Sequence, residues 1–193
     1  MGFEYELKFR ATPQIQQKIR QDLDLPEQIF HMHTTYYDTP DEALSARWYT
    51  LRRRMENGLS VCTLKYPAGE KGRGEIEVEC TDIEKTLPEL CKLSGLADLP
   101  RLLEKGLVEV CGARFDRTAM TVDLGDTVVE LALDAGVLTG GGREVPRCEV
   151  EVELKKGSRE MTAAFAKRLA LTYGLAVEKG SKFRRAQALA RGE

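Results

Sequence analysis

Hydrophobic and polar residues alternate along much of the chain, starting with its first strand. In residues 3–10, FEYELKFR, every second residue is apolar, and the residues between them are two acids followed by two bases. A period of two is typical of a strand with one buried face. The same alternation predicts further strands at about 30–37, 47–56, 59–66, 74–80, 107–123, 127–134 and 145–155.

Segments with helical spacing of apolar residues separate some of these strands. A threonine–proline pair at 12–13 is typical of a helix start, and apolar residues then recur every fourth position. Further helices are predicted at about 84–94, 99–105, 158–173 and 182–190. No Gly/Ser-rich or Pro-rich linker divides the chain. We therefore expect residues 1–193 to form one α+β domain of antiparallel strands with a few helices.

Charged residues on the polar faces of the strands form repeated patterns. Glutamates occupy alternate positions in three strands, at 4–6, 75–79 and 149–153. Like charges two residues apart repel one another, which weakens a strand unless a cation bridges them. The acids on the polar faces are Glu4, Glu6, Glu75, Glu77, Glu79, Glu130, Asp134, Glu149, Glu151 and Glu153. The bases on these faces are Lys8, Arg10, Arg52, Arg54, Lys65, Arg117, Arg147 and Lys155.

Two arrangements of the strands would satisfy this alternation. In the first, the apolar faces pack together as a sandwich and the charged faces meet water, as charged faces usually do. In the second, helices cover the apolar faces from outside, and the sheet curls into a barrel whose lumen holds the charges. Because unpaired buried charges cost several kcal/mol each, such a lumen must be wet, ion-paired and filled by a charged ligand. The repeated glutamates favour the second arrangement.

The charged faces contain groups that suit both a metal ion and a phosphate chain. Carboxylates without histidine or cysteine partners suit Mg²⁺ or Mn²⁺. Arginine and lysine side chains suit a polyanion, most simply a phosphate chain. A polyphosphate that carries a metal ion would neutralise both sets of residues, so we predict a ligand of this kind.

The overall composition excludes several classes of partner. The 29 basic and 31 acidic residues leave a net charge of −2, so no general attraction to nucleic acid or membranes is expected. Neither a long apolar stretch nor a basic segment followed by an apolar run is found, so we expect no transmembrane helix and no signal peptide. Five scattered cysteines without a C-x-x-C pair predict reduced thiols in a cytoplasmic protein.

A set of short motifs follows in order along nearly the whole chain. These are E-x-E-x-K at Glu4, Glu6 and Lys8; Tyr36-Tyr37-Asp38-Thr39; Leu51-Arg52-x-Arg54; Thr63-Leu64-Lys65; Glu75 and Glu77; Arg117; Glu130-x-x-x-Asp134-x-Gly136; Glu149-x-Glu151-x-Glu153; and Ser181-Lys182 with Arg185. The ordered set resembles the CYTH superfamily, the triphosphate tunnel metalloenzymes. One such motif occurs by chance in charged strands, but the series is specific.

The resemblance implies an eight-stranded antiparallel tunnel, open at both ends, with a charged lumen and helices on the outside. It also implies chemistry at a triphosphate with Mg²⁺ or Mn²⁺, for which we expect two metal ions. The residues expected to bind the phosphate chain are Lys8, Arg52, Arg54, Lys65, Arg117, Lys182 and Arg185. The residues expected to hold or surround the metal ions are Glu4, Glu6, Glu75, Glu77, Glu130, Asp134, Glu149, Glu151 and Glu153. Glu4, Glu6 and the phosphate-binding residues other than Arg185 are also expected to be catalytic.

Three functions are consistent with these residues. The first is hydrolysis of inorganic tripolyphosphate to diphosphate and phosphate, which suits a charged lumen without an obvious base pocket. The second is an enzyme for an organic triphosphate, either thiamine triphosphate or ATP that is cyclised to cAMP, and it predicts an aromatic or apolar platform at one mouth of the tunnel. The third is a module that binds polyphosphate or a nucleotide without turnover. We expect a monomer or a homodimer.

Overall fold

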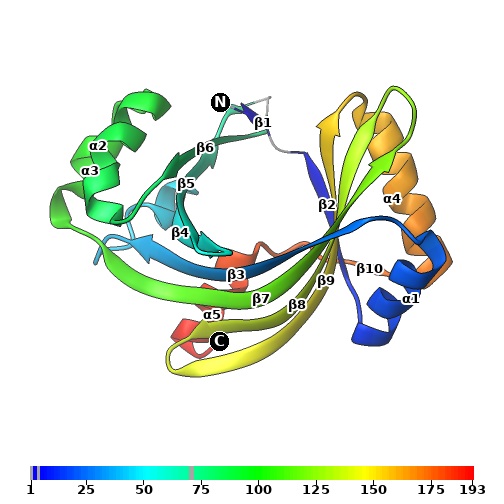
Figure 1. Cartoon of the computed structure of the whole chain (residues 1–193). Helices are drawn as coiled ribbons and strands as arrows, with labels where there is room; N and C mark the ends of the chain where they lie inside the picture. The colour runs from blue at the N-terminus through cyan, green and yellow to red at the C-terminus, as the bar shows by residue number, and fades with distance from the viewer. Residues whose placement is uncertain (1, 4, 70–71) are drawn as a thin grey trace.

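The computed structural model of the chain describes residues 2–3, 5–69 and 72–193. The strands in these ranges are β1 (Gly2–Phe3), β2 (Glu6–Arg10), β3 (Glu27–Asp38), β4 (Thr50–Glu56), β5 (Leu59–Pro67), β6 (Arg73–Glu79), β7 (Val108–Asp123), β8 (Val128–Gly140), β9 (Arg143–Lys156) and β10 (Ala176–Val177). They form one antiparallel sheet in the order β1-β6-β5-β4-β3-β7-β8-β9-β2-β10 (Figure 1). The α+β class is confirmed.

The opening segment of the chain contributes to both ends of this sheet. β1 pairs with β6, with Gly2 opposite Glu75, whereas β2 pairs with β9, with Glu6 opposite Glu153. The sheet curves so that β1 and β2 approach each other across a gap (Figure 1), but no pairing closes it within the described residues. A closed barrel of eight strands is therefore not confirmed. The expected first strand divides into β1 and β2, and β10 is a further short strand.

Polar side chains and a glycine set the ends of several helices. The Oγ1 of Thr12 accepts a bond from the Ile15 N–H at the start of the first helix, and the Oγ of Ser158 accepts one from Met161. Gly174, in the left-handed conformation, ends the helix that begins after Ser158. The helices are α1 (Pro13–Leu23), α2 (Ile83–Ser94), α3 (Leu99–Leu102), α4 (Arg159–Tyr173) and α5 (Lys182–Arg191), with single turns η1 (Ser45–Arg47) and η3 (Leu103–Lys105). Among the described residues, no helix is both long and apolar enough to cross a membrane.

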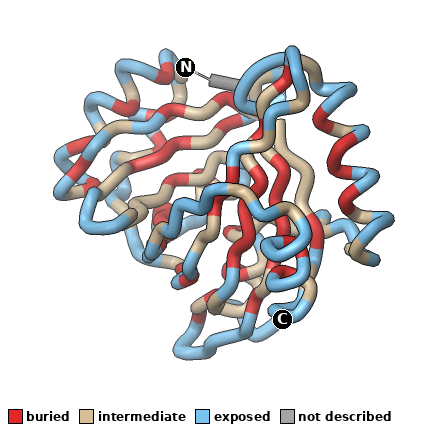
Figure 2. Tube along the Cα trace, turned by 45° about the vertical axis from the view of Figure 1, so that its right-hand side comes forward, coloured by how far each residue is buried: buried red, intermediate tan, exposed pale blue. Residues whose placement is uncertain are grey.

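Helices cover the convex face of the sheet on both sides (Figure 1). Val150 and Val152 of β9 are fully buried in a core with Phe165 of α4. Ile76 of β6 belongs to a separate core with Leu90 of α2. Figure 2 shows how buried residues alternate with exposed ones along the strands and the outer helices. The apolar partners of the acidic strands thus contact helices rather than one another, which rules out the sandwich arrangement.

Helix α5 differs from the other helices because it packs against the concave face of the sheet. Its Phe183 lies in one apolar cluster with Met32, Tyr36 and Phe115, and the ring centroids of Tyr36 and Phe183 are 5.3 Å apart. The expectation that helices lie only on the outside is therefore wrong for α5. The inward faces of β3 and β7 are apolar at this end of the sheet, so they need a cover of their own.

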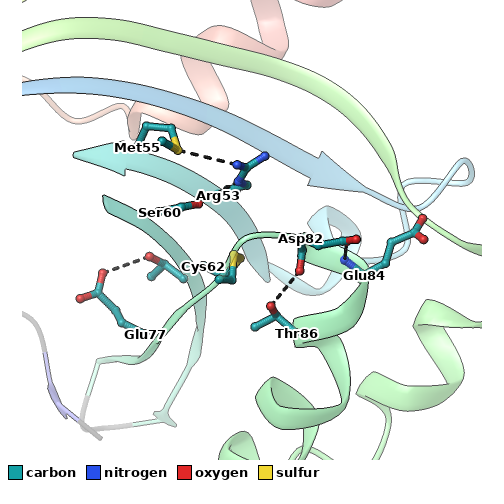
Figure 3. The surroundings of a disulfide bond; sticks show 10 residues. Arg53, Met55, Ser60, Cys62, Glu77, Asp82, Glu84 and Thr86 are labelled. Carbon is teal, nitrogen blue, oxygen red and sulfur yellow. Dashed lines mark hydrogen bonds between the residues drawn. A yellow bond between two sulfur atoms is a disulfide. The ribbon is translucent and has the colours of Figure 1, made fainter. Parts of the chain in front are cut away.

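A disulfide bond joins Cys62 of β5 to Cys80, directly after β6, on the convex side of the sheet (Figure 3). This bond corrects the expectation that all the cysteines are reduced thiols. Cys62 lies opposite Val78, so Cys80 is its diagonal neighbour, with a Cα–Cα distance of 5.8 Å that suits a disulfide. The spacing of the cysteines along the chain does not predict this pairing, because the pairing depends on the register of two strands. The free thiols are Cys91, Cys111 and Cys148.

Candidate functional site

The concave face of the sheet forms a cavity of about 280 Å³ that is lined mainly by charged side chains. The alternation within each strand directs these side chains inward, while their neighbours face the outer helices. Within the described ranges, the lining bases are Lys8, Arg52, Arg54, Lys65, Arg73, Arg117, Lys155 and Lys182. The lining acids there are Glu6, Glu56, Glu75, Glu77, Glu130, Glu151 and Glu153.

Strands β4, β5 and β6 form one side of the cavity, which we call the β4–β6 wall. The Nη2 of Arg52 lies 3.7 Å from the Oε1 of Glu75 and 3.6 Å from the Oε1 of Glu77. The Nζ of Lys65 lies 3.3 Å from the same Glu75 oxygen. These distances exceed the 2.7–2.9 Å that is typical of charge-assisted hydrogen bonds. The bases of this wall therefore form loose ion pairs with the acids of β6.

Arg54 places a second guanidinium beside that of Arg52. It forms a close ion pair with Glu56 and lies 3.8 Å from Glu77. Burial lowers the pKa of Arg54, and repulsion from Arg52 lowers it further. Two like charges are thus held side by side, an arrangement that an anionic ligand would stabilise.

Three carboxylates stand in a row on the opposite side of the cavity. Glu153 of β9 lies opposite Glu6 of β2 and opposite Glu130 of β8 in the strand register. Lys8 is 2.6 Å from Glu6, and Lys155 is 3.0 Å from Glu153 and 3.6 Å from Glu130. Neighbouring like charges repel across strands, so this row of hard oxygen donors suits a divalent cation such as Mg²⁺ or Mn²⁺.

A second group of three carboxylates lies deeper, and with its bases we call it the buried network. Oxygens of Asp134, Glu149 and Glu151 all lie within 4.8 Å of one another, a spacing that a metal ion could use. Arg117 contacts both oxygens of Asp134, at 2.7 and 2.9 Å, and lies 2.5 Å from Glu151. The Nζ of Lys182 is 3.1 Å from Asp134 and also pairs with Glu151. A cation placed here would have to displace these ion pairs.

Two further arginines, neither of which lines the cavity, complete the buried network. The Nη2 of Arg147 donates to Asp134 at 2.9 Å and to Glu149 at 2.5 Å. Arg185 of α5 pairs with the other oxygen of Glu149. Asp134 and Glu149 have side chains only 0% and 1% exposed, so both depend on these bases for compensation.

The bases of the buried network lower the pKa values of two of its acids, Glu151 and Asp134. Burial would raise the pKa of Glu151, but Lys182 and Arg117 hold it well below its usual range. The pKa of Asp134 is lowered by the same two bases, again against the effect of burial. Burial lowers the pKa of Lys182 despite its two acidic partners. Both carboxylates are therefore ionised at neutral pH.

The structure brings most of the predicted site residues together. Those that line the cavity are Glu6, Lys8, Arg52, Arg54, Lys65, Glu75, Glu77, Arg117, Glu130, Glu151, Glu153 and Lys182. Asp134, Glu149 and Arg185 lie behind this lining in the buried network, and Glu4 lies outside the described residues.

Three charged lining residues are missing from the predicted site, namely Glu56, Arg73 and Lys155. The alternation of inward and outward positions along a strand predicts that each of them faces the cavity. Arg73, for example, lies two positions before Glu75 on the same face of β6, and its guanidinium donates to the Thr50 hydroxyl at 3.2 Å. Arg147, two positions before Glu149, could have been added to the deeper set by the same rule.

The CYTH domain family matches residues 2–186. The chain belongs to this family. Among curated proteins, the CYTH chain is 31% identical over 190 residues to the inorganic triphosphatase of Haemophilus influenzae, covering 94% of this chain and 53% of that protein. The chain thus spans about half the length of this relative. The resemblance inferred from the motifs is confirmed at the level of the family.

Solved structures share this CYTH fold at low sequence identity. A candidate adenylate cyclase from Bacillus halodurans has a TM-score of 0.68 at 17% identity, covering 95% of this chain and 96% of that one. A candidate adenylyl cyclase from Hippeastrum, described with a dominant triphosphatase activity, has a TM-score of 0.64 at 21% identity, covering 98% and 95%. At these identities the likeness establishes the fold alone.

Proposed function

We propose that this protein hydrolyses inorganic tripolyphosphate to diphosphate and phosphate with bound Mg²⁺ or Mn²⁺. The observation that carries the proposal is one small cavity in which carboxylates and Arg/Lys side chains are interleaved. A metal-bound polyphosphate is a ligand that pairs with both sets at once. The name of the Haemophilus influenzae relative supports the same substrate.

The phosphate chain would bind to bases on both sides of the cavity. Arg52 and Lys65 reach in from the β4–β6 wall, while Lys8, Arg117 and Lys182 face them from β2, β7 and α5. Because Arg52 and Lys65 lie 3.3 Å or more from Glu75, phosphate oxygens at hydrogen-bonding distance would make shorter contacts with them. The bases would fix the chain for in-line attack and offset charge on the leaving diphosphate.

The cation would be held by the carboxylate row of Glu6, Glu130 and Glu153. Glu4 belongs to the same predicted set but lies outside the described residues. Glu75 and Glu77 form a second carboxylate pair on the β4–β6 wall, where a second cation would fit. When bound, a divalent cation supplies Lewis acidity to the phosphate and lowers the pKa of an attacking water.

We also propose that the curved sheet surrounds the substrate as a tunnel. β1 pairs at one end of the sheet and β2 near the other, and two residues of the chain separate them. Walls on all sides would exclude water and strengthen the ionic contacts inside. The single-domain organisation, the cytoplasmic location and the monomeric or homodimeric state remain predictions.

A phosphate-release assay with malachite green tests the proposal directly. The purified protein is incubated with tripolyphosphate, ATP or thiamine triphosphate, each with Mg²⁺, Mn²⁺ or EDTA. We expect rapid release from tripolyphosphate with at least one metal, and no release in EDTA. Equal rates with EDTA and with metal would refute the metal dependence, and binding without release would identify a non-catalytic phosphate-binding module.

A second candidate, hydrolysis or cyclisation of an organic triphosphate, has one observation in its favour. Apolar side chains, among them Phe30, Met32, Phe115 and Phe183, line part of the same cavity beside the bases. Such a surface could contact the organic group of a substrate. A higher kcat/KM for ATP or thiamine triphosphate than for tripolyphosphate in the same assay would favour this candidate.

A further inference from the structure

Arg147 occupies a position that is difficult to explain by stability alone. Its side chain is 1% exposed, and its Nε and Nη1 have no hydrogen-bond partner among the described residues. Its guanidinium lies 4.4 Å from the ring centroid of Phe115, which lines the cavity. A buried charge with unsatisfied donors is costly, and an apolar side chain of similar length would avoid that cost. This cost suggests a role for the positive charge itself.

The charges of the buried network balance only when Arg147 is included, because Arg185 also pairs with Glu178 at 3.4 Å. Its acids are Asp134, Glu149 and Glu151, and its bases are Arg117, Arg147, Lys182 and Arg185. Only Arg117, Lys182 and Glu151 of this set also line the cavity. A ligand in the cavity therefore meets the positive charge of the network through Arg117 and Lys182.

The contacts of Asp134 explain how Arg147 can act on these two bases. The Oδ2 of Asp134 is contacted by Arg117 at 2.9 Å, by Arg147 at 2.9 Å and by Lys182 at 3.1 Å. Arg147 does not line the cavity, whereas the other two bases do. Without Arg147, the acids would exceed the remaining bases by one, and both cavity bases would be held more strongly by Asp134.

We propose that Arg147 is a positioning residue for triphosphate binding. It compensates Asp134 and Glu149 from behind, so that Lys182 and Arg117 can offer positive charge to phosphate oxygens in the cavity. This inference rests on the proposed function, because it assumes that the cavity binds a triphosphate. It assigns Arg147 no contact with the substrate.

The first test compares three single variants by their KM and kcat for tripolyphosphate. Arg147→Met removes the charge but keeps an unbranched side chain, and Arg147→Lys keeps the charge. Arg114→Met is the matched control, because Arg114 forms an exposed ion pair with Glu144. We expect Arg147→Met to raise KM at least about tenfold with kcat changed less than about threefold, as for a loss of uniform binding. Arg147→Lys should restore most of the affinity, and the control should match wild type.

The second test restores the charge balance without restoring the arginine. In the double variant Arg147→Met with Glu149→Gln, the charges of the network balance again, as they do in wild type. A charge effect predicts that the KM returns toward the wild-type value. A purely structural role predicts that stability recovers while the KM does not, because removing both members of a buried ion pair is better tolerated than removing one of them.

Glu149→Gln alone keeps the inference testable if Arg147→Met does not fold. This change leaves the network with one positive charge in excess, so we expect KM to fall, whereas damage to the fold would raise it. An unchanged or higher KM in Glu149→Gln would overturn the inference, as would a folded Arg147→Met variant with the wild-type KM. If wild type neither binds nor hydrolyses tripolyphosphate, the proposed function fails instead.

Discussion

The two sides of the cavity hold their charges in different ways. On the β4–β6 wall, Arg52 and Lys65 lie 3.7 and 3.3 Å from Glu75, and these side chains are 12–21% exposed. In the buried network, Asp134 is fully buried and accepts contacts of 2.7 to 3.1 Å from three bases. A loose, partly exposed pair can exchange one partner for a ligand. A buried pair cannot, because the remaining charge would be left uncompensated.

This difference separates binding from positioning. The bases of the β4–β6 wall are partly exposed and can contact phosphate, and the buried network has the rigidity to hold Arg117 and Lys182 in place. Substitutions in the wall should therefore reduce activity more than stability. Substitutions in the network should reduce stability first.

The largest effect is expected from Asp134→Asn. This change keeps the size of the side chain but leaves Arg117, Arg147 and Lys182 around a neutral group. We expect the free energy of unfolding to fall by about 3–5 kcal/mol, as when one partner of a buried ion pair is removed. Chemical denaturation measures this loss.

The matched control for this variant is Asp116→Asn, in an exposed pair with His31 where the aspartate side chain is 66% exposed. It should change stability by about 0.5 kcal/mol or less. Equal losses in the two variants would show that Asp134 is not central to a buried network.

The next effect concerns the carboxylate row. Glu6→Gln removes one hard oxygen ligand and one negative charge from the proposed cation site, so we expect turnover of tripolyphosphate to fall about a hundredfold or more. Its thermal stability should stay close to that of wild type, because Glu6 is partly exposed.

Glu144→Gln on the outer surface serves as the control for Glu6→Gln, since its side chain is 52% exposed. It should keep full activity. Substantial EDTA-insensitive turnover in Glu6→Gln would contradict the metal-dependent mechanism.

Strand periodicity predicted the elements of the fold well, but it could not predict contacts between distant elements. The alternation predicted the strands that carry the acids, and it also predicted which face of each strand is apolar. The Cys62–Cys80 disulfide depends on the register between β5 and β6, which alternation within one strand does not determine. The inward position of α5 depends on the apolar patch formed jointly by Met32, Tyr36 and Phe115 from two strands.

Parity also predicted which face each charged residue occupies, but not its depth. Glu149, Glu151 and Glu153 share one face of β9, yet Glu153 lines the cavity while Glu149 lies behind its lining. The difference arises because Arg147 and Arg185 reach Glu149. How deeply each of these side chains is buried depends on the neighbouring strands and on α5. It therefore cannot be predicted from the sequence of β9 alone.

A smaller effect on activity is expected from the β4–β6 wall. Arg52→Ala and Lys65→Ala should each lower kcat/KM for tripolyphosphate at least about tenfold, which corresponds to about 1.4 kcal/mol. Tripolyphosphate should raise the melting temperature of wild type more than that of either variant. The ligand-free stability should hold or rise, because repulsion among the bases is relieved.

Arg53→Ala is a close control for these variants. Arg53 lies between Arg52 and Arg54 in the sequence, but it does not line the cavity, and its Nε donates to the Ser60 hydroxyl at 2.8 Å. The Arg53→Ala variant should bind tripolyphosphate as tightly as wild type does. If tripolyphosphate raised the melting temperature equally in wild type, Arg52→Ala, Lys65→Ala and Arg53→Ala, the inward bases would not hold the substrate.

The smallest effect should appear in the pH dependence of stability. Burial would raise the pKa of Asp134, but Lys182 and Arg117 lower it below its unfolded value. Such a carboxyl stabilises the fold above its unfolded pKa, which is about 3.9 for aspartate. This contribution is lost as the pH falls through the lower, folded pKa. The contribution of Asp134 to the free energy of unfolding should therefore not change with pH near neutrality and should begin to fall near pH 4, as its protonation in the unfolded chain begins.

Asp134→Asn removes this titrating group and provides the comparison. Below about pH 4, its unfolding free energy should fall less steeply than that of wild type, by up to about 1.4 kcal/mol per pH unit for one proton. Denaturant titrations at about pH 7, 5 and 3.5 measure both slopes. The buried pairs are poorly screened, so the difference should persist in high salt. If the free energy of unfolding changed with pH equally in wild type and Asp134→Asn, the bases of the network would not lower the pKa of Asp134.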